Sequence, residues 1–362
     1  MQINSKIKLS EKDFFKTIES KIDLAQNPFV IYKKPNENQL IGIFQLNEML
    51  HEWQSDVSSF VVAPFENQQV FAIPLDESEI FFADFEPKEM NLFSDKSNDF
   101  STDDKFQFEK LVSNGIDFMK QNDFPKVVLS RKQEVEIDNI SMLNCFENAL
   151  NLYPTAFNFL LFHPKFGFWM GATPEQLIRI KNGVFETVSL AGTQVFSESI
   201  TWQTKEIEEQ ALVTEYIQEI VGKFSENMQV SEPQTVQAGH LAHLKTYFKG
   251  NLNPEASLQE LILNLHPTPA VCGLPKEAAL QFILKNENYN RSLYTGFLGE
   301  WQFKSESTDS NTDLFVNLRC MEFLKNKAFI YVGCGVTKES QPALEFMETV
   351  QKSKTMLRII NQ

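Results

Sequence analysis

Three ionisable side chains lie on one face of a helix predicted near the C-terminus. Glu345, Glu348 and Lys352 are spaced i, i+3 and i+7, and the same stripe continues with Met356 and Ile359. These positions share a narrow face, on which an amphipathic helix normally buries apolar side chains. Charges are tolerated there when they pair with one another or hold a metal. The face is therefore a candidate site, and the alternative is a salt-bridge cluster at a domain surface.

A further carboxylate occupies an apolar helix face in the middle of the chain. The pattern predicts a helix from about residue 202 to 224, in which Val213, Tyr216 and Ile220 form the apolar stripe. Glu209 heads that stripe, whereas Glu208, Glu215 and Glu219 lie on the hydrated side. Glu209 is therefore a second candidate for a metal or a substrate.

The composition limits the classes of partner. The chain has 362 residues, 42% of them hydrophobic, and a formal net charge of −15. It can bury a large core, while its charge argues against nucleic acid and anionic membranes as partners, so a small molecule is favoured. We expect a cytoplasmic protein, because the start lacks a secretory pattern and the longest apolar stretch, residues 157–170, is too short to span a bilayer.

Several common cofactor motifs are missing from the sequence. The four cysteines have no CxxC spacing, and neither a P-loop nor a GxGxxG pattern is present. We therefore expect reduced thiols and no classical nucleotide site.

Short apolar segments and turn signals predict a mixed α and β architecture. Strands are expected at residues 29–33, 59–65, 69–75, 126–131, 158–164, 166–172, 294–301, 314–323 and 328–333, with a hairpin over 177–193 that turns at Asn182-Gly183. Helices are expected at 202–224, 256–264, 276–286 and the C-terminus. So many hairpins favour antiparallel sheets flanked by helices, an α/β protein of the α+β type. The polar segment 94–104 is the expected connector between an N-terminal part and the rest.

The chain resembles a known family in a series of blocks from about residue 106 to the C-terminus. The blocks, in family order, are KVVLSR, GATPEQL, SLAGT, KEIEEQALV, LHPTPAVCGLP, YTGFLGEW, NLRCMEF, and GCGV followed by EFMETVQKSKTML. They are similar to those of the chorismate-utilising enzymes, and within these of the isochorismate synthases. The resemblance implies the family's fold, with residues 1–105 as its variable N-terminal part and residues 106–362 as the chorismate-binding catalytic region.

The resemblance implies a base and an acid. Lys126 matches the lysine that activates water, and it shares a strand face with Val128 and Ser130, where desolvation would lower its pKa. The alternative is a lysine at an exposed strand end. Glu175 matches the general acid, which needs a raised pKa.

The residues next to Glu175 allow an interpretation other than the general acid. Thr173, Pro174 and Gln176 resemble a capping box, in which Glu175 would only complement a helix dipole that lowers its pKa. The acid role requires burial or a second carboxylate to outweigh that effect.

A magnesium site follows from the same resemblance. Glu209 and Glu348 match the two glutamates that hold Mg²⁺ in the family, and Glu345 is close enough in sequence to bind directly or through water. A few carboxylates with waters and a substrate carboxylate form a normal Mg²⁺ shell. Gln210 stands where relatives often have histidine or asparagine, a departure from the family pattern beside a metal glutamate.

The substrate's carboxylates also have expected partners. Arg319 and Lys352 match the residues that take the enolpyruvyl and ring carboxylates. Gly333 and Gly335 fit a loop whose N–H groups approach a carboxylate, although a strand-ending turn is the ordinary use of glycine. Gly192 of the SLAGT block is interpreted in the same way.

The sequence also gives three further residues, in or near the matching blocks, an expected role. Thr193 follows Gly192 and belongs to the same expected binding segment. His243 matches a substrate-pocket histidine, although a lone histidine is more often structural. His266 is expected to shape its loop.

The implied reaction converts chorismate to isochorismate with Mg²⁺, for menaquinone or siderophore synthesis. The loop LHPTPAVCGLP resembles isochorismate synthases, whereas the aminating anthranilate and aminodeoxychorismate synthases typically carry a PAGT-type loop. Salicylate synthases rank second, and a non-catalytic chorismate-binding protein is a further alternative. Isochorismate synthases of this kind are often monomers, so the resemblance implies a monomer. It also implies that no glutaminase subunit is needed, because water does not require an ammonia channel.

Overall fold

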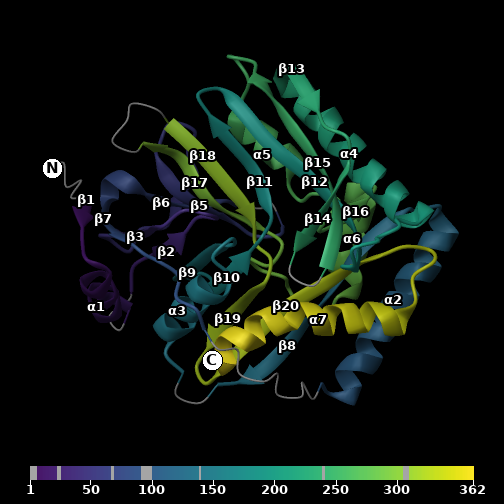
Figure 1. Cartoon of the computed structure of the whole chain (residues 1–362), viewed down its shortest axis with the longest axis horizontal. Helices are drawn as coiled ribbons and strands as arrows, with labels where there is room; N and C mark the ends of the chain where they lie inside the picture. The colour runs from purple at the N-terminus through teal and green to yellow at the C-terminus, as the bar shows by residue number, and fades with distance from the viewer. Residues whose placement is uncertain are drawn as a thin grey trace.

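Two large β-sheets form the centre of the molecule in this computed structural model (Figure 1). The structure describes residues 6–22, 26–66, 69–90, 100–137, 140–238, 241–304 and 310–362. Within this part of the chain each sheet has ten strands, and every neighbouring pair is antiparallel except β1 with β7. The expected architecture of antiparallel sheets flanked by helices is thus confirmed.

The first sheet joins strands from both ends of the chain. Its order is β1 (Lys6–Lys8), β7 (Ser78–Asp84), β3 (Gln39–Gln45), β2 (Phe29–Lys33), β9 (Phe157–His163), β10 (Gly167–Thr173), β19 (Cys320–Leu324), β20 (Lys327–Val336), β8 (Lys126–Glu136) and β16 (Gly273–Leu274).

The second sheet also includes strands of the N-terminal part. Its order is β13 (Ser225–Val230), β15 (Leu241–Leu252), β12 (Val184–Val195), β11 (Gln176–Lys181), β18 (Ser310–Val316), β17 (Phe297–Lys304), β5 (Ser59–Ala63), β6 (Phe71–Pro74) and β4 (His51–Glu52), with β14 (Gln234–Ala238) paired to β15. The strands before residue 105 therefore belong to both sheets, and the division at that residue stays a prediction.

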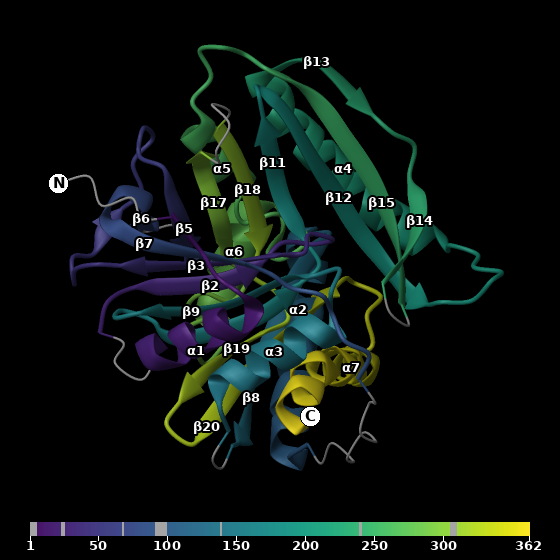
Figure 2. The ribbon, with the colours of Figure 1, turned by 60° about the vertical axis from the view of Figure 1, so that its left-hand side comes forward.

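The helices cover the outer faces of the two sheets. They are α1 (Glu11–Ile22), α2 (Thr102–Asn122), α3 (Met142–Leu152), α4 (Thr204–Phe224), α5 (Leu258–Leu265), α6 (Lys276–Asn286) and α7 (Pro342–Asn361), with a 3₁₀ turn η1 at Leu75–Glu77. Apolar side chains of α1, α3 and α7 pack on the first sheet, and those of α4 and α5 pack on the second. Figure 2 shows α4 lying along the long strands β12 and β15.

Aromatic side chains join the two sheets face to face. Phe157 of the first sheet stacks on Phe315 of the second with ring centroids 4.2 Å apart, and Tyr32 packs on Phe60 at 5.2 Å. All four side chains are almost completely buried. The apolar layer between the sheets therefore fixes their relative position.

Two predicted elements differ from the structure. The expected strand 314–323 is two strands, because the chain leaves the second sheet after Val316 and enters the first at Cys320. The polar segment 94–104 overlaps the start of α2, where Ser101 caps the helix by accepting from the amides of Asp103 and Asp104. The acidic residues there serve a helix N-terminus, whereas residues 94–99 lie outside the described residues.

No helix in the described ranges is long and apolar enough to cross a membrane.

Candidate active site

A cavity of about 440 Å³ opens between the two sheets and α7. It gathers candidate residues from four strands, two helices and two sheet-to-sheet connections. Eleven of the residues predicted from the sequence line it: Lys126, Glu175, Gly192, Glu209, His243, Arg319, Gly333, Gly335, Glu345, Glu348 and Lys352. Thr193 is paired with His243 in the strand register, and its side chain lies outside the described residues.

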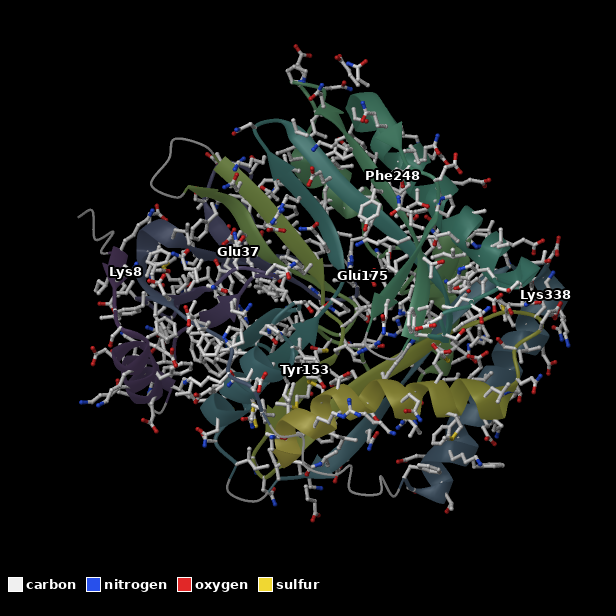
Figure 3. All side chains as sticks on the ribbon, in the orientation of Figure 1. Lys8, Glu37, Tyr153, Glu175, Phe248 and Lys338 are labelled. Atoms are coloured by element: carbon white, nitrogen blue, oxygen red, sulfur yellow. The ribbon has the colours of Figure 1, made fainter. Side chains whose placement is uncertain are left out.

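Glu175 and Arg319 lie where the chain crosses from one sheet to the other. Glu175 stands between β10 and β11, and Arg319 stands between β18 and β19. The two crossings are joined by backbone bonds from the Val316 amide to the Glu175 carbonyl (2.9 Å) and from the Ala172 amide to the Arg319 carbonyl (3.0 Å). Both side chains are thereby placed at the cavity between the sheets, and Figure 3 shows Glu175 near the middle of the molecule.

Arg319 adopts an unusual backbone conformation, with φ of 47°. A side chain other than glycine rarely occupies this left-handed region, and such strain persists where the surrounding structure holds it. Burial lowers the pKa of the guanidinium from its usual value, but arginine remains charged. A buried cation in the cavity wall is suited to bind a carboxylate.

The environment of Glu175 favours its protonated form. Burial raises the pKa of Glu175 to about 7, against the opposing effects of Arg319, Lys126, Lys352 and Lys245. No helix starts at this position, since β11 follows directly, so the capping-box interpretation is wrong. Thr173 instead donates to the Val316 carbonyl (2.6 Å) and accepts from the Glu175 amide (3.3 Å). Glu175 can thus deliver a proton near neutral pH.

Lys126 is buried at the start of β8, only 3% exposed, so the alternative of an exposed strand end is wrong. Its Nζ contacts Oε1 of Glu209 at 2.6 Å. Gly335 of the adjacent strand lies close to this pair: a Cβ there would lie 3.1 Å from Cε of Lys126 and 3.4 Å from Oε1 of Glu209. The absence of a side chain at residue 335 therefore makes room for this ion pair.

Gly333 and Gly335 lie within strand β20, not in the loop that was predicted. They face Ser130 and Val128 of β8, while the pairing with β19 stops at Tyr331. The Gly333 carbonyl accepts from Nζ of Lys352 at 2.9 Å, away from β8. In an antiparallel strand the N–H and C=O of one residue point to the same side, so the N–H groups of both glycines lie on this uncovered edge beside the cavity.

The charged face of α7 also lines the cavity. Glu345 is 7% exposed, Lys352 contacts Glu348 at 2.7 Å, and Met356 and Ile359 are fully buried further along the same face. The predicted stripe therefore divides into a polar half at the cavity and an apolar half in the core.

The carboxylates suit a hard divalent cation in their chemistry. Among the described residues no three His, Cys, Asp or Glu side chains already converge as a metal cluster. Glu209 and Glu348 each contact a lysine, whereas Mg²⁺ needs only one or two protein carboxylates when waters and substrate complete its shell. The oxygen donors of Glu209, Glu345 and Glu348 fit that requirement once the two lysine contacts loosen.

Gly192 occupies a β-bulge in strand β12. The register shifts between Ala191 and Thr193, φ of Gly192 is 65°, and a Cβ there would lie 3.0 Å from that of Glu206. The Gly192 carbonyl accepts from Nδ1 of His243 at 3.2 Å. Burial lowers the pKa of His243 to about 4, so a neutral imidazole faces the cavity at pH 7.

His266 and Gln210 lie away from the cavity lining. His266 contacts the carbonyl of Pro64 through Nε2 at 3.2 Å, and burial lowers its pKa to about 3, in keeping with a loop-shaping role. Gln210 is buried behind the site, where its amide donates to the hydroxyls of Ser189 (2.8 Å) and Thr246 (3.0 Å). The side chain that departs from the family pattern is thus a packing feature between α4 and its sheet.

The sequence analysis missed several residues of the cavity wall, among them Glu206, Lys245 and Tyr294. Glu206 accepts from the Gln203 amide (3.0 Å) and so caps α4. Lys245 follows His243 by two residues on β15, a strand that was not predicted. Its signal was the alternation of polar His243 and Lys245 with apolar neighbours, which places both on one face of a strand.

Comparison with known proteins identifies relatives of the whole cavity region. The sequence model described as "Chorismate binding enzyme" matches residues 58–361. The salicylate biosynthesis isochorismate synthase of Pseudomonas aeruginosa is 30% identical over 269 residues, which cover 71% of this chain and 55% of that protein. Isochorismate synthase EntC of Escherichia coli K12 is 30% identical over 264 residues, which cover 70% of this chain and 66% of EntC. The matches thus span less than two thirds of either relative.

A solved structure matches over nearly all of the chain. The Bacillus anthracis protein DhbC, described as a 2,3-dihydroxybenzoate-specific isochorismate synthase, superimposes with a TM-score of 0.77 and 25% sequence identity. The superposition covers 95% of this chain and 99% of that one.

Proposed function

Because this chain belongs to the family of chorismate-binding enzymes, we propose that it is an isochorismate synthase, which isomerises chorismate by adding water at C2 and removing the hydroxyl at C4. The similarity to isochorismate synthases from Pseudomonas aeruginosa and Escherichia coli supports this proposal. The product would serve menaquinone or siderophore synthesis.

One observation carries the proposal from the structure's side. A buried lysine and a carboxyl group with a pKa of about 7, Lys126 and Glu175, line one cavity together with cationic side chains. A displacement that adds water at one ring carbon and expels hydroxide from another needs one base and one acid. The side-chain chemistry of this cavity supplies both.

The proposed reaction uses the two groups in concert. Lys126 takes a proton from water as the water oxygen bonds to C2, and the ring double bonds shift. Glu175 gives its proton to the C4 hydroxyl, which leaves as water. Arg319 and Lys352 hold the substrate's carboxylates. Lys126 must leave its contact with Glu209 and release its own proton before its neutral amine can accept one from water.

We further propose that Glu209, Glu348 and Glu345 hold Mg²⁺. The ion would supply electrostatic stabilisation of a substrate carboxylate. Glu348→Gln should weaken the binding of Mn²⁺, used as a spectroscopic substitute, by about tenfold in an electron paramagnetic resonance titration. Exchange of the exposed Glu219 of α4, which pairs with Lys223, is the control. An unchanged Mn²⁺ titration in Glu348→Gln would exclude this residue as a ligand.

The decisive experiment is incubation of the purified protein with chorismate, with and without Mg²⁺ and ammonium, followed by chromatography of the products. Mg²⁺-dependent isochorismate without released pyruvate is the expected result. Salicylate with pyruvate would indicate a salicylate synthase, an aminated product would indicate the ammonia-using branch, and no turnover would favour a binding protein.

A further inference from the structure

The cavity contains more cations than its ion pairs use. Four cationic side chains line it: Lys126, Lys245, Arg319 and Lys352. Lys126 is held by Glu209 at 2.6 Å, and Lys352 by Glu348 at 2.7 Å and by the Gly333 carbonyl. Neither Lys245 nor Arg319 forms an ion pair within the described ranges. These two side chains thus present positive charge to the cavity outside any ion pair of the described residues.

Strand β15 directs Lys245 to the same face as His243. The two residues are separated by one position, and successive side chains of a strand alternate between its faces. Lys245 stands opposite Leu190, which also lines the cavity, and its Nζ lies 4.7 Å from the centre of the Tyr247 ring. The aromatic ring supports the ammonium on one side and leaves its donors available on the other.

Lys245 and Arg319 also act on the same carboxyl group. Both lower the pKa of Glu175, opposing the effect of its burial. The two cations therefore lie within electrostatic range of the proposed acid.

We propose that Lys245, together with Arg319, binds one carboxylate of a dicarboxylate substrate, and so helps to select such substrates. This inference rests on the proposed function, in which chorismate contributes its two carboxylates. Arg319 offers a planar pair of donors and Lys245 a mobile point charge, a combination suited to one carboxylate. Lys352, which already holds Glu348 and a carbonyl, serves the other carboxylate when substrate arrives.

The test compares two lysines of the same strand. Lys245→Met should raise KM for chorismate and weaken its equilibrium binding, measured by calorimetry, by about tenfold or more, with kcat changed much less. Lys245→Arg should restore most of the affinity. Lys249→Met is the matched control, because Lys249 is exposed on β15 and pairs with Glu186 at 2.7 Å, and it should leave KM unchanged.

Two results would overturn the proposal. Binding and KM equal to wild type in Lys245→Met would remove the residue from the binding site, and a loss confined to kcat would contradict a carboxylate-binding role. Calorimetry separates this inference from the proposed function, since a wild-type protein that binds chorismate without converting it contradicts only the proposed reaction. Far-ultraviolet circular dichroism of each variant checks that the fold is intact.

Discussion

Glu175 illustrates how burial sets the chemistry of a single residue. Its neighbours in the sequence suggest a helix start, which would favour the charged carboxylate, whereas the structure places it at a crossing between two sheets. Burial then raises its pKa from the usual 4.5 to about 7. An acid that keeps its proton near neutral pH is the form the proposed reaction needs.

The raised pKa of Glu175 predicts a dependence of stability on pH. The folded state binds a proton more tightly than the unfolded state, so ionisation destabilises the fold progressively between about pH 4.5 and pH 7 and fully above it. Glu175→Gln should therefore gain stability over wild type at pH 8, by on the order of 3 kcal/mol, and gain almost nothing at pH 4. Urea unfolding at both pH values measures this.

Glu175→Gln should also abolish turnover, at pH 4 and at pH 8 alike. Wild-type kcat/KM should fall as the pH rises through about 7, because the acid loses its proton. A Glu175→Gln variant with the same stability difference at pH 4 and pH 8 would contradict the assigned pKa.

Lys126 is predicted to be essential for chemistry but not for folding. Lys126→Ala removes the proposed base and should lower kcat by at least about 100-fold, while far-ultraviolet circular dichroism remains that of wild type. Lys132→Ala is the control, because Lys132 is a half-buried lysine of the same strand that lies beside Glu322. Near-normal turnover in Lys126→Ala would refute the assigned base.

At the scale of elements, two charged side chains replace a missing strand beside β8. Strand β16 covers only the beginning of β8, at Lys126 and Val127. Beyond it, Arg291 donates to the Val128 carbonyl at 2.7 Å, and Glu287 accepts from the Ser130 amide at 2.7 Å. Because Val128 also lines the cavity, this pair holds the strand that presents Lys126.

This arrangement gives a prediction that distinguishes it from an ordinary buried ion pair. Arg291→Met leaves the Glu287 carboxylate buried and uncompensated, and should cost about 3–5 kcal/mol. Replacing both residues by methionine removes the uncompensated charge but leaves the Val128 carbonyl and the Ser130 amide without partners, so the double variant should still be destabilised by about 2 kcal/mol or more. Equilibrium urea unfolding provides both values. A double variant as stable as wild type would show that the pair does not replace strand bonds.

The local elements were largely predictable, whereas their assignment to sheets was not. The strands at 29–33 and the helix at 276–286 have the boundaries expected from their patterns. The segment 314–323 is equally apolar on both sides of Arg319, so its periodicity contains no sign that the chain changes sheets there. The φ of 47° at Arg319 is imposed by the two crossings and not by its own sequence.

The candidate site was predictable for a different reason. Glu209, Glu345 and Glu348 are carboxylates on apolar helix faces, and the resemblance to a family assigned them a common place, which the cavity confirms as a shared location. Lys245 escaped prediction because its strand β15 was not recognised, and only the strand places it at the cavity.

At the scale of the whole molecule, the N-terminal strands are integral to the sheets. Strands β2 and β3 lie between β7 and β9 in the first sheet, and β2 pairs directly with β9 over Phe29 to Lys33. The matched sequence model begins only at residue 58, so a fragment defined by that match would lack both strands. Such a fragment would expose the edge of β9 and the apolar layers on both sides of it.

Deletion of residues 1–57 should therefore prevent folding of the remainder. Eight apolar side chains of β2 and β3 are buried, namely Phe29, Val30, Ile31, Tyr32, Leu40, Ile41, Ile43 and Phe44. At about 1.5–3 kcal/mol for each, their loss comes to about 12–24 kcal/mol, which matches or exceeds the roughly 5–15 kcal/mol that typically holds a domain folded. The fragment 58–362 should aggregate in size-exclusion chromatography and show no cooperative urea transition. Deletion of residues 1–8, which removes the exposed edge strand β1, should leave a cooperative transition. A monomeric fragment 58–362 with cooperative unfolding would contradict this prediction. It would mean that these residues fold without strands β2 and β3.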